Sequence, residues 1–286
     1  WVIVAGACLF AAFPEWYATL FSGFYLPLLL ILLALILRGV SFEYRHQRDG
    51  HAWKRGFDRM IVIGSVVPAL LWGVAFGNIV QGVPIDADKN VTGTLLDLLN
   101  PYALCVGITT LLLFFLHGVY FVGLKADGQV KEDAHRLARR AALPTIVFAA
   151  ATVVWTTLIS MERDAPLVSA VIACGVIAAL ALLASAVANV RHRDGWAFAL
   201  GAATIVTAVL MLWFALFPYV MPSSTDPANS LTIENASSTD YTLTVMTWAA
   251  VIFLPGILAY QAWTYWVFRK RITRVQIEKA DAAAAH

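Results

Sequence analysis

Charged residues are scarce in this sequence. Asp, Glu, Lys and Arg make up 13% of the 286 residues, whereas hydrophobic residues make up 60%. Soluble globular domains carry about 25% charged residues. The deficit excludes an ordinary soluble domain and predicts a polytopic membrane protein. The net charge of +2 is small and the basic residues are divided among separate loops, so nucleic acid is not an expected partner.

Cysteine and metal-ligand patterns are also sparse. The three cysteines stand singly inside apolar runs, so neither a disulfide framework nor a paired-cysteine metal site is predicted. Within the long apolar runs there is one histidine, His117. Because a buried haem needs axial ligands inside the bundle, a single histidine favours a hydrogen-bonded structural role over a ligand. With no phosphate-binding loop or nucleophile elbow either, the residues favour a hydrophobic scaffold subunit over a self-sufficient enzyme.

The start of the chain lacks an initiator Met and the basic region of a signal peptide. Residues 1–13 are apolar but too few to cross a bilayer, which needs about 20. We therefore expect this run to be the outer half of a helix, and the given sequence to be truncated at its N-terminus.

Long apolar runs recur along the rest of the chain. The clearest covers residues 16–38 and has no charge before Arg38. At ~1.5 Å per residue such a run crosses a hydrocarbon core of ~30 Å, and in lipid its backbone must satisfy its own hydrogen bonds as a helix. Further runs of this kind cover residues 60–80, 101–124, 144–161, 167–190, 196–217 and 241–268. The sequence therefore predicts an all-α transmembrane helix bundle with about eight spans, counting residues 1–13.

The loops between these runs alternate in their Lys and Arg content. Basic residues gather in the segments 41–59, 125–140, 191–194 and the tail from residue 269, and are depleted in 81–100, 162–165 and 218–240. Since short loops rich in Lys and Arg stay in the cytoplasm, the first set and the C-terminus are predicted to be cytoplasmic.

A weak internal repeat suggests two related half-bundles. Asp58 precedes Trp72, and Asp194 precedes Trp213. Each Trp begins a W-x-x-x-F pattern, and an acidic outer loop follows each pattern. The alternative is that both tryptophans are interfacial anchors. We predict a single membrane domain over residues 1–286. If the repeat is real, its first half covers residues 1–124, its second half covers 141–268, and a cytoplasmic tail covers 269–286.

Four charged residues near the helix ends are candidates for function. Arg38 is either a functional cation at bilayer depth or a snorkelling anchor. Glu15 either opens a proton route or caps a helix. Asp58 and Asp240 begin apolar runs, where a carboxylate favours the positive end of the helix dipole; the Ser-Thr-Asp sequence ending at Asp240 is typical of an N-cap.

Three segments resemble subunit II of the cytochrome bd quinol oxidases. AGACLFAAFPEWYATLFSGFYLPLLLILLALILRGVSFEYR is similar to its second and third helices, GSVVPALLWGVAFGNIVQGVP to its fourth, and FPYVMPSSTDPANSLTIENASSTDYTLTVMTWAAVIFLPGILAYQAWTYWVF to its last two with their outer loop. Family members have nine spans. The family's first helix, and the acid-bearing WDGN segment assigned to its proton path, are not in this sequence.

The resemblance implies a terminal oxidase of the bacterial inner membrane. The complex takes electrons from quinol, reduces O2 to water with cytoplasmic protons and so generates a proton motive force. It implies that the b- and d-type haems lie in subunit I, with none in this chain, and that this chain scaffolds subunit I, lines part of a proton path and in some members holds a structural quinone or lipid. Small single-span accessory subunits are further partners it suggests. Arg38, Glu43 and Arg45 match a family motif and become candidates for assembly or partner contact.

A free-standing polytopic transporter is the alternative from another class. Coupled transporters normally carry several acids or bases in mid-span, and the runs here are almost free of them. The two hypotheses differ in association, because an oxidase subunit must bury one face against another membrane protein.

Overall fold

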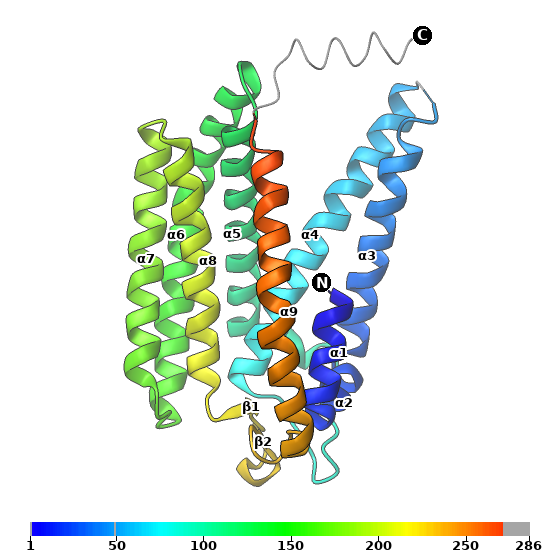
Figure 1. The fold of residues 1–286 in the computed structure, drawn as a ribbon, viewed down its shortest axis with the longest axis vertical. Coiled ribbons are helices and arrows are strands. Elements are labelled where there is room, and N and C mark those ends of the chain that lie inside the picture. The colour runs from blue at the N-terminus through cyan, green and yellow to red at the C-terminus, as the bar shows by residue number, and fades with distance from the viewer. Residues whose placement is uncertain (1, 49, 271–286) are drawn as a thin grey trace.

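The computed structural model describes residues 2–48 and 50–270, and these are almost entirely helical (Figure 1). The helices are α1 (Val2–Ala12), α2 (Pro14–Gly23), α3 (Tyr25–Tyr44), α4 (His51–Gln81), α5 (Pro101–Lys125), α6 (Gln129–Glu162), α7 (Val168–Val190), α8 (Asp194–Leu216) and α9 (Asp240–Val267). Two short 3-10 helices, Asp97–Leu99 and Pro227–Asn229, and a hairpin of β1 (Tyr219–Met221) with β2 (Leu231–Thr232) lie in the connections.

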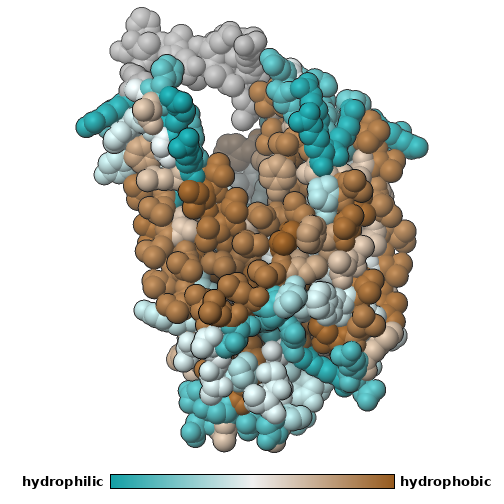
Figure 2. Space-filling view, turned by 180° about the vertical axis from the view of Figure 1, so that it is seen from behind, coloured by the Kyte–Doolittle hydropathy of each residue, from teal (hydrophilic) through white to brown (hydrophobic). Residues whose placement is uncertain are grey.

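Seven helices of the described chain, α3 to α9, are long and apolar enough to cross a membrane. Each corresponds to one of the seven long apolar runs, so the predicted all-α membrane bundle is confirmed. Figure 2 shows their surface as a hydrophobic band between two more polar ends. Burial within the most apolar stretch of each helix does not exceed 33%, so most of these side chains face lipid or a partner rather than the chain itself.

The prediction of one uninterrupted helix over residues 16–38 was wrong. Helix α2 ends at Gly23, Phe24 leaves helical geometry, and α3 begins at Tyr25. Pro27 explains the break, because it has no N–H to donate to the carbonyl of Gly23 one turn earlier. Gly23 also packs against the α4–α5 connection, because a Cβ there would collide with the side chain of Val91. The side chain of Phe24 is 1% exposed and anchors the break in the core.

The predicted loop over residues 41–59 is shorter than expected. Helix α3 continues to Tyr44 and α4 begins at His51, so both helices extend beyond the apolar runs. Trp53 explains part of this extension, since its Nε1 donates to the carbonyl of Tyr44 at 2.9 Å and its ring packs edge-on against Phe57. Helix α6 begins at Gln129 and therefore takes in most of the basic segment 125–140.

Small residues allow neighbouring helices to approach closely. A Cβ at Gly77 of α4 would lie 2.7 Å from the Cα of Ala103 on α5, and one at Gly107 of α5 would lie 2.7 Å from Val74 Cγ2. In lipid, where the hydrophobic effect does not drive helices together, such packing is a main source of stability. One core cluster contains residues of α4, α5, α7 and α8, so the two halves share an interior; their division at residues 124 and 141 stays a prediction.

The α4–α5 and α8–α9 connections form an ordered cap at one end of the bundle. Its buried core includes Phe24, Val83 and Ile85 together with Met221 and Leu231 of the hairpin. Gly82, at φ +92°, turns the chain out of α4, a backbone conformation that favours glycine.

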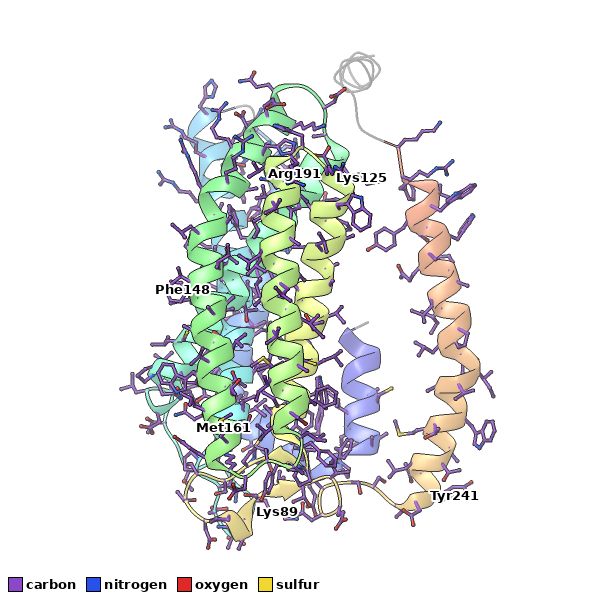
Figure 3. All side chains as sticks on the ribbon, turned by 90° about the vertical axis from the view of Figure 1, so that its left-hand side faces the viewer. Lys89, Lys125, Phe148, Met161, Arg191 and Tyr241 are labelled. Atoms are coloured by element: carbon purple, nitrogen blue, oxygen red, sulfur yellow. The ribbon has the colours of Figure 1, made fainter. Side chains whose placement is uncertain are left out.

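Helix α9 stands apart from the other spans (Figures 1 and 3). None of its most apolar stretch is buried, and its main helix contact is with α1. Two hydrogen bonds tie its ends to the bundle: Ser238 N to Ala12 O at 2.8 Å, and Lys125 Nζ to Phe268 O at 2.7 Å. Most of the predicted tail, residues 271–286, lies outside the described residues.

Candidate functional site

The basic end of the bundle brings two predicted site residues together. Arg45 caps α3, and its Nε lies 2.6 Å from Oδ1 of Asp58 in α4, with a second contact of 3.4 Å from the guanidinium to Oδ2. Asp58 is the eighth residue of α4, so it lies beyond the first turn where a carboxylate caps a helix. The pair instead joins α3 to α4 at their ends.

Arg38 and Glu43 lie on the exposed surface of α3. The guanidinium of Arg38 stands 5.7 Å from the ring centroid of Phe42, a cation–π arrangement. The backbone of Arg38 is held close to α4, because a Cβ at Gly64 would lie 2.6 Å from Arg38 Cβ. The three motif residues therefore occupy the last two turns and the cap of one helix, where Arg45 faces α4 and Arg38 and Glu43 remain accessible.

The opposite end holds the other two predicted acids. Glu15, in the first turn of α2, forms an ion pair with Lys89 of the outer loop. Asp240 is the first residue of α9 and is exposed, while the cap itself is Thr239, whose Oγ1 accepts from Thr242 N. Glu15 thus joins α2 to the connection after α4, and Asp240 stands next to the capping residue of α9.

Arg163 closes the same end between α6 and α7. Its guanidinium donates to the carbonyl oxygens of Val80, at 2.5 Å, and of Gln81, which are left unpaired where α4 ends. Burial lowers the pKa of Arg163 from its usual value. This cation thus stabilises the C-terminus of α4, where the helix dipole is negative.

His117 occupies the interior between α5 and α8. Its ring stacks on Phe198, with centroids 4.5 Å apart. Its Nδ1 is buried and has no hydrogen-bond partner in the described chain, so the expectation of a hydrogen-bonded histidine is not met at this atom. A Cβ at Gly201 would lie 3.2 Å from Nδ1, so this nitrogen faces the backbone of α8.

A buried polar cluster joins α6, α7 and α8 at the basic end, near Arg191 and Lys125 in Figure 3. Asp194 Oδ2 lies 2.9 Å from Lys131 Nζ, and Asp194 Oδ1 lies 3.1 Å from His135 Nε2. His135 Nδ1 lies 2.9 Å from Asn189 Oδ1. The sequence placed Lys131, His135 and Asp194 in basic segments outside the apolar runs, and Asn189 at the end of one. The four-residue spacing of Lys131 and His135 puts both on one helix face and is the signal that could have found them.

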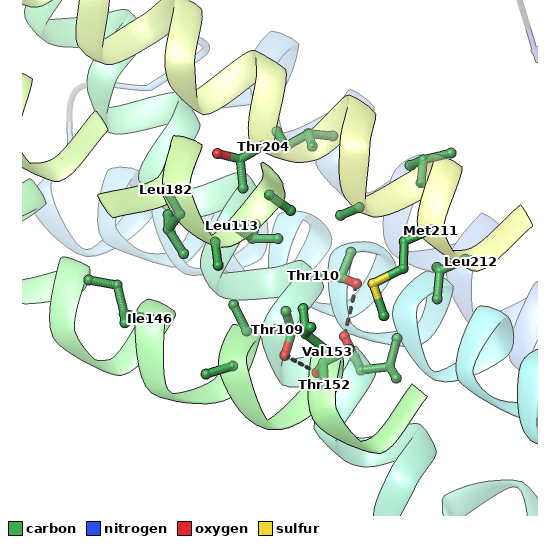
Figure 4. A pocket seen from close by; sticks show the side chains of 18 of the residues that line it. Thr109, Thr110, Leu113, Ile146, Thr152, Val153, Leu182, Thr204, Met211 and Leu212 are labelled. Atoms are coloured by element: carbon green, nitrogen blue, oxygen red, sulfur yellow. Dashed lines mark hydrogen bonds between the residues drawn. The ribbon is translucent and has the colours of Figure 1, made fainter. Parts of the chain in front are cut away.

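A cavity of about 450 Å³ opens among α4 to α8 (Figure 4). Its walls include Leu113, Ile146, Leu182, Met211 and Leu212, together with four threonines. The threonine hydroxyls are already bonded, for example Thr109 to Thr152 at 2.7 Å and Thr110 to the carbonyl of Val106 at 2.9 Å. Because the hydroxyls are satisfied, the cavity offers an apolar surface and suits a hydrocarbon chain.

No group of three or more His, Cys, Asp and Glu side chains within residues 2–48 and 50–270 is placed to hold a metal ion. A bis-histidine haem site needs a second histidine, and none lies beside His117 in the apolar runs of the described residues. The apolar cavity and the exposed α9 are thus features of a membrane-embedded helical protein.

Comparison with known proteins identifies the family. Residues 1–268 match the family described as cytochrome bd terminal oxidase subunit II, and the chain belongs to this family. It is 37% identical over 279 residues to cytochrome bd ubiquinol oxidase subunit 2 of Bacillus subtilis, covering 96% of this chain and 80% of that protein. It is 35% identical over 314 residues to cytochrome bd-I ubiquinol oxidase subunit 2 of Escherichia coli, covering 98% and 82%.

A solved structure of bd oxidase from Geobacillus thermodenitrificans has a similar fold. The TM-score is 0.60 at 17% identity, over 85% of this chain and 73% of that chain. The family resemblance drawn from the sequence is thus confirmed, and the transporter alternative gains no support.

Proposed function

We propose that this chain is the haem-free half of a quinol:O2 oxidoreductase and that helix α9 docks it onto a haem-bearing partner subunit. As a member of the subunit II family, the chain is one subunit of a bd-type terminal oxidase. The observation that carries the docking proposal is the complete exposure of the apolar stretch of α9. Every other span buries between 17% and 33% of its stretch within the chain.

The composition of α9 supports a protein partner. Large side chains stand out from several sides of the helix, and the most exposed aromatic ones are Tyr241, Trp248, Phe253, Tyr265 and Phe268. Aromatic residues are enriched at protein interfaces, where they bury much area at little entropic cost. Arg38 and Glu43 on α3 are accessible as well, and their role in partner contact or assembly stays part of this proposal.

The assignment of the haems to the partner follows from the ligand requirement. The two b-type haems and the d-type haem that the resemblance implies need protein ligands buried in the bundle. Among the histidines of the described chain, only His117 lies in an apolar run, and its Nδ1 faces Gly201 without a hydrogen-bond partner. We therefore route no redox step through this chain and assign it scaffolding and a share in proton delivery, for which Glu15 and Asp58 remain candidates.

The apolar cavity is proposed to hold the hydrocarbon tail of a quinone or lipid. Its threonine hydroxyls are engaged with each other or with helix carbonyls, so the walls favour a tail over a polar head group. Extraction of the purified complex, followed by mass spectrometry, separates the two sources. Met211→Trp, which fills the cavity from α8, is expected to remove the bound tail, whichever source supplies it.

The loops also support an orientation. Basic residues lie at the end that carries Lys125 and Arg191, and the outer cap carries the acidic loops. This distribution fits a bacterial inner-membrane protein with its C-terminus in the cytoplasm.

A tryptophan scan tests the docking surface. Exposed positions of α9 between residues 251 and 258, and exposed positions of α7 between 176 and 183, are changed singly to Trp in a tagged chain. We expect variants on one face of α9 to lose the co-purifying large subunit and its haem absorption, while α7 variants keep both. Equal effects on the two helices, or wild-type chain that purifies alone, colourless and stable, would overturn the proposal.

A further inference from the structure

The short segment before α5 exposes three leucines around a buried one. Leu95, Leu96 and Leu99 are 36%, 77% and 41% exposed. Leu98 is 4% exposed and belongs to the buried core of the cap. The turn therefore has an inner side that packs on the cap and an outer side that presents aliphatic surface. Contiguous exposed apolar surface of this kind marks a site that meets lipid or another protein.

Asn78 of α4 clamps this segment from beneath. Its side chain is 2% exposed, and its Nδ2 donates to the carbonyl of Leu98 at 2.7 Å and to that of Val74 at 2.8 Å. Its Oδ1 accepts from Asn100 Nδ2 at 2.8 Å, and Asn100 Oδ1 in turn accepts from Ala103 N at 2.8 Å to cap α5. Both ends of the buried amide thus have partners, and the turn is fixed to α4 and α5 at once.

The one charged residue of the segment 94–100 is turned back on the chain. The carboxylate of Asp97 accepts from the N–H of Thr94 at 2.7 Å and from its Oγ1 at 2.8 Å. Pro101 is the first residue of α5, which is long and apolar enough to cross a membrane. The three leucines therefore stand next to the point where the chain enters the apolar layer, without a free charge among them.

The composition of the segment favours lipid over a protein partner. Its exposed large side chains are all leucine, whereas protein interfaces are anchored by Trp, Tyr and Arg, and leucine is under-represented among their hot spots. Helix α9, in contrast, presents exposed Trp and Tyr side chains. An aliphatic face beside a membrane-crossing helix suits insertion at the boundary between head groups and acyl chains.

We propose that residues 94–99 are a membrane-interface anchor, in which Leu95, Leu96 and Leu99 insert among the acyl chains of the leaflet at the capped end. The clamp from Asn78 holds the turn at this depth, and Leu98 couples it to the core of the cap. The cap is thereby held against the membrane surface. This contact with lipid is independent of the docking of α9 and of where the haems lie.

Quenching by spin-labelled lipid tests the anchor. Leu96→Cys is introduced into a chain whose three native cysteines are changed to Ala, and the purified complex is labelled with bimane. The complex is placed in nanodiscs of phosphatidylcholine and phosphatidylglycerol, with a nitroxide on either the fifth or the fourteenth acyl carbon of part of the phosphatidylcholine. An interfacial segment lies about 5–10 Å into the boundary, so the shallow nitroxide should quench about twofold more than the deep one.

Asp88→Cys is the matched control, because Asp88 is exposed in the same connection. Its label should be quenched by iodide in water and little by either lipid. Two results at residue 96 would overturn the proposal. Quenching by iodide to the extent found at residue 88 would mean that water covers the leucines, and protection from both iodide and the nitroxide lipids would mean that a protein covers them.

The role of the clamp is tested in the same labelled chain. Asn78→Leu removes the amide that holds Leu98 and Asn100, so lipid quenching at residue 96 should fall towards the value at residue 88. Ser65→Ala on α4 is the control, because Ser65 Oγ donates only within its own helix, to the carbonyl of Ile61 at 2.7 Å. Lipid quenching that is unchanged in Asn78→Leu would refute the role given to the clamp.

A further measurement uses the wild-type complex and needs no variant. A phosphatidylcholine with a diazirine near the start of one acyl chain is included in the nanodiscs and activated by light, and the adducts are mapped by digestion and mass spectrometry. Adducts within residues 94–99 and none within 86–92 support the anchor. Adducts on α5 with none on residues 94–99 refute it.

Discussion

The hydroxyl of Tyr102 on α5 lies 2.8 Å from that of Thr156 on α6, and the tyrosine is completely buried. Thr156 donates in turn to the carbonyl of Thr152 at 2.7 Å, so the tyrosine is the donor between the two hydroxyls. Through this bond a buried side chain of one span is fixed directly to the next. In a low-dielectric interior such a bond is worth more than on the surface.

Tyr102→Phe should therefore destabilise the protein by about 1 kcal/mol, because one hydrogen bond is lost while the ring still fills its space. Tyr102→Ala should cost about 3–5 kcal/mol, since it also leaves a cavity. Thermal unfolding of the purified complex measures both. Tyr241→Phe, at a side chain that is 80% exposed, is the control and should change little. Equal effects of Tyr102→Phe and Tyr241→Phe would contradict a stabilising role for the buried hydroxyl.

Gly77→Ala tests the close approach of α4 and α5. The added methyl would meet the Cα of Ala103 at 2.7 Å, and backbone cannot move aside as a flexible side chain can. Overpacking of this kind destabilises by about 1–3 kcal/mol. Gly118→Ala on α5 is the matched control, because a Cβ added at Gly118 would meet nothing within 4 Å. A comparable fall in Tm in both variants would mean that replacing a glycine within a helix lowers the stability by itself, without the contact to Ala103.

The ion pair of Arg45 and Asp58 predicts rescue by charge exchange. Arg45→Asp and Asp58→Arg should each lower the yield of assembled complex, because two like charges would then meet between α3 and α4. The double variant restores opposite charges at the same two positions and should recover most of the yield. Arg48→Asp, in the same connection, is the control. Failure of the double variant to recover would mean that Arg45 is needed for a contact other than Asp58.

Asp97 makes the stability of the cap formed by the α4–α5 and α8–α9 connections depend on pH in the acidic range. The N–H and the Oγ1 of Thr94 bond its carboxylate at 2.7 and 2.8 Å, and these bonds hold the pKa of Asp97 below its usual range. A carboxyl with a lowered pKa contributes stability above the ordinary value of about 4 and loses it as the pH falls. Acid should therefore increase proteolysis within residues 81–100. Asp97→Asn should remove that pH dependence and Asp88→Asn, at an exposed position, should leave it unchanged.

Seven of the about eight predicted spans correspond to helices α3 to α9, because apolar length decides them. The remaining one, residues 1–13, contains α1, whose 11 residues are too few to span. The break between α2 and α3 was missed because the apolar run continues through Phe24. Pro27 indicates the break, but hydrophobicity alone does not reveal that a backbone N–H is missing. The lengths of α3 and α4 beyond their apolar runs depend on local contacts such as Trp53 with Tyr44, which span counting ignores.

The site residues were harder to predict than the spans. Arg45 and Asp58 were singled out for separate reasons, and their pairing depends on the antiparallel register of two helices. The cluster around His135 was missed because its members come from three helices and lie in segments whose charge suggested solvent. Sequence reveals charge and spacing on one helix, whereas burial between helices depends on tertiary packing.

His117→Phe separates a structural histidine from a ligand. The buried Nδ1 has no partner in the described chain, so replacing the imidazole with an apolar ring removes an unsatisfied polar atom and keeps the stacking on Phe198. We expect the Tm of the complex to stay the same or rise slightly, and the haem absorption per complex to be unchanged. Phe198→Ala, which removes the stacking partner, should instead destabilise the complex by about 3–5 kcal/mol. Loss of a haem band in His117→Phe would make this residue a ligand after all and would refute the assignment of all haems to the partner subunit.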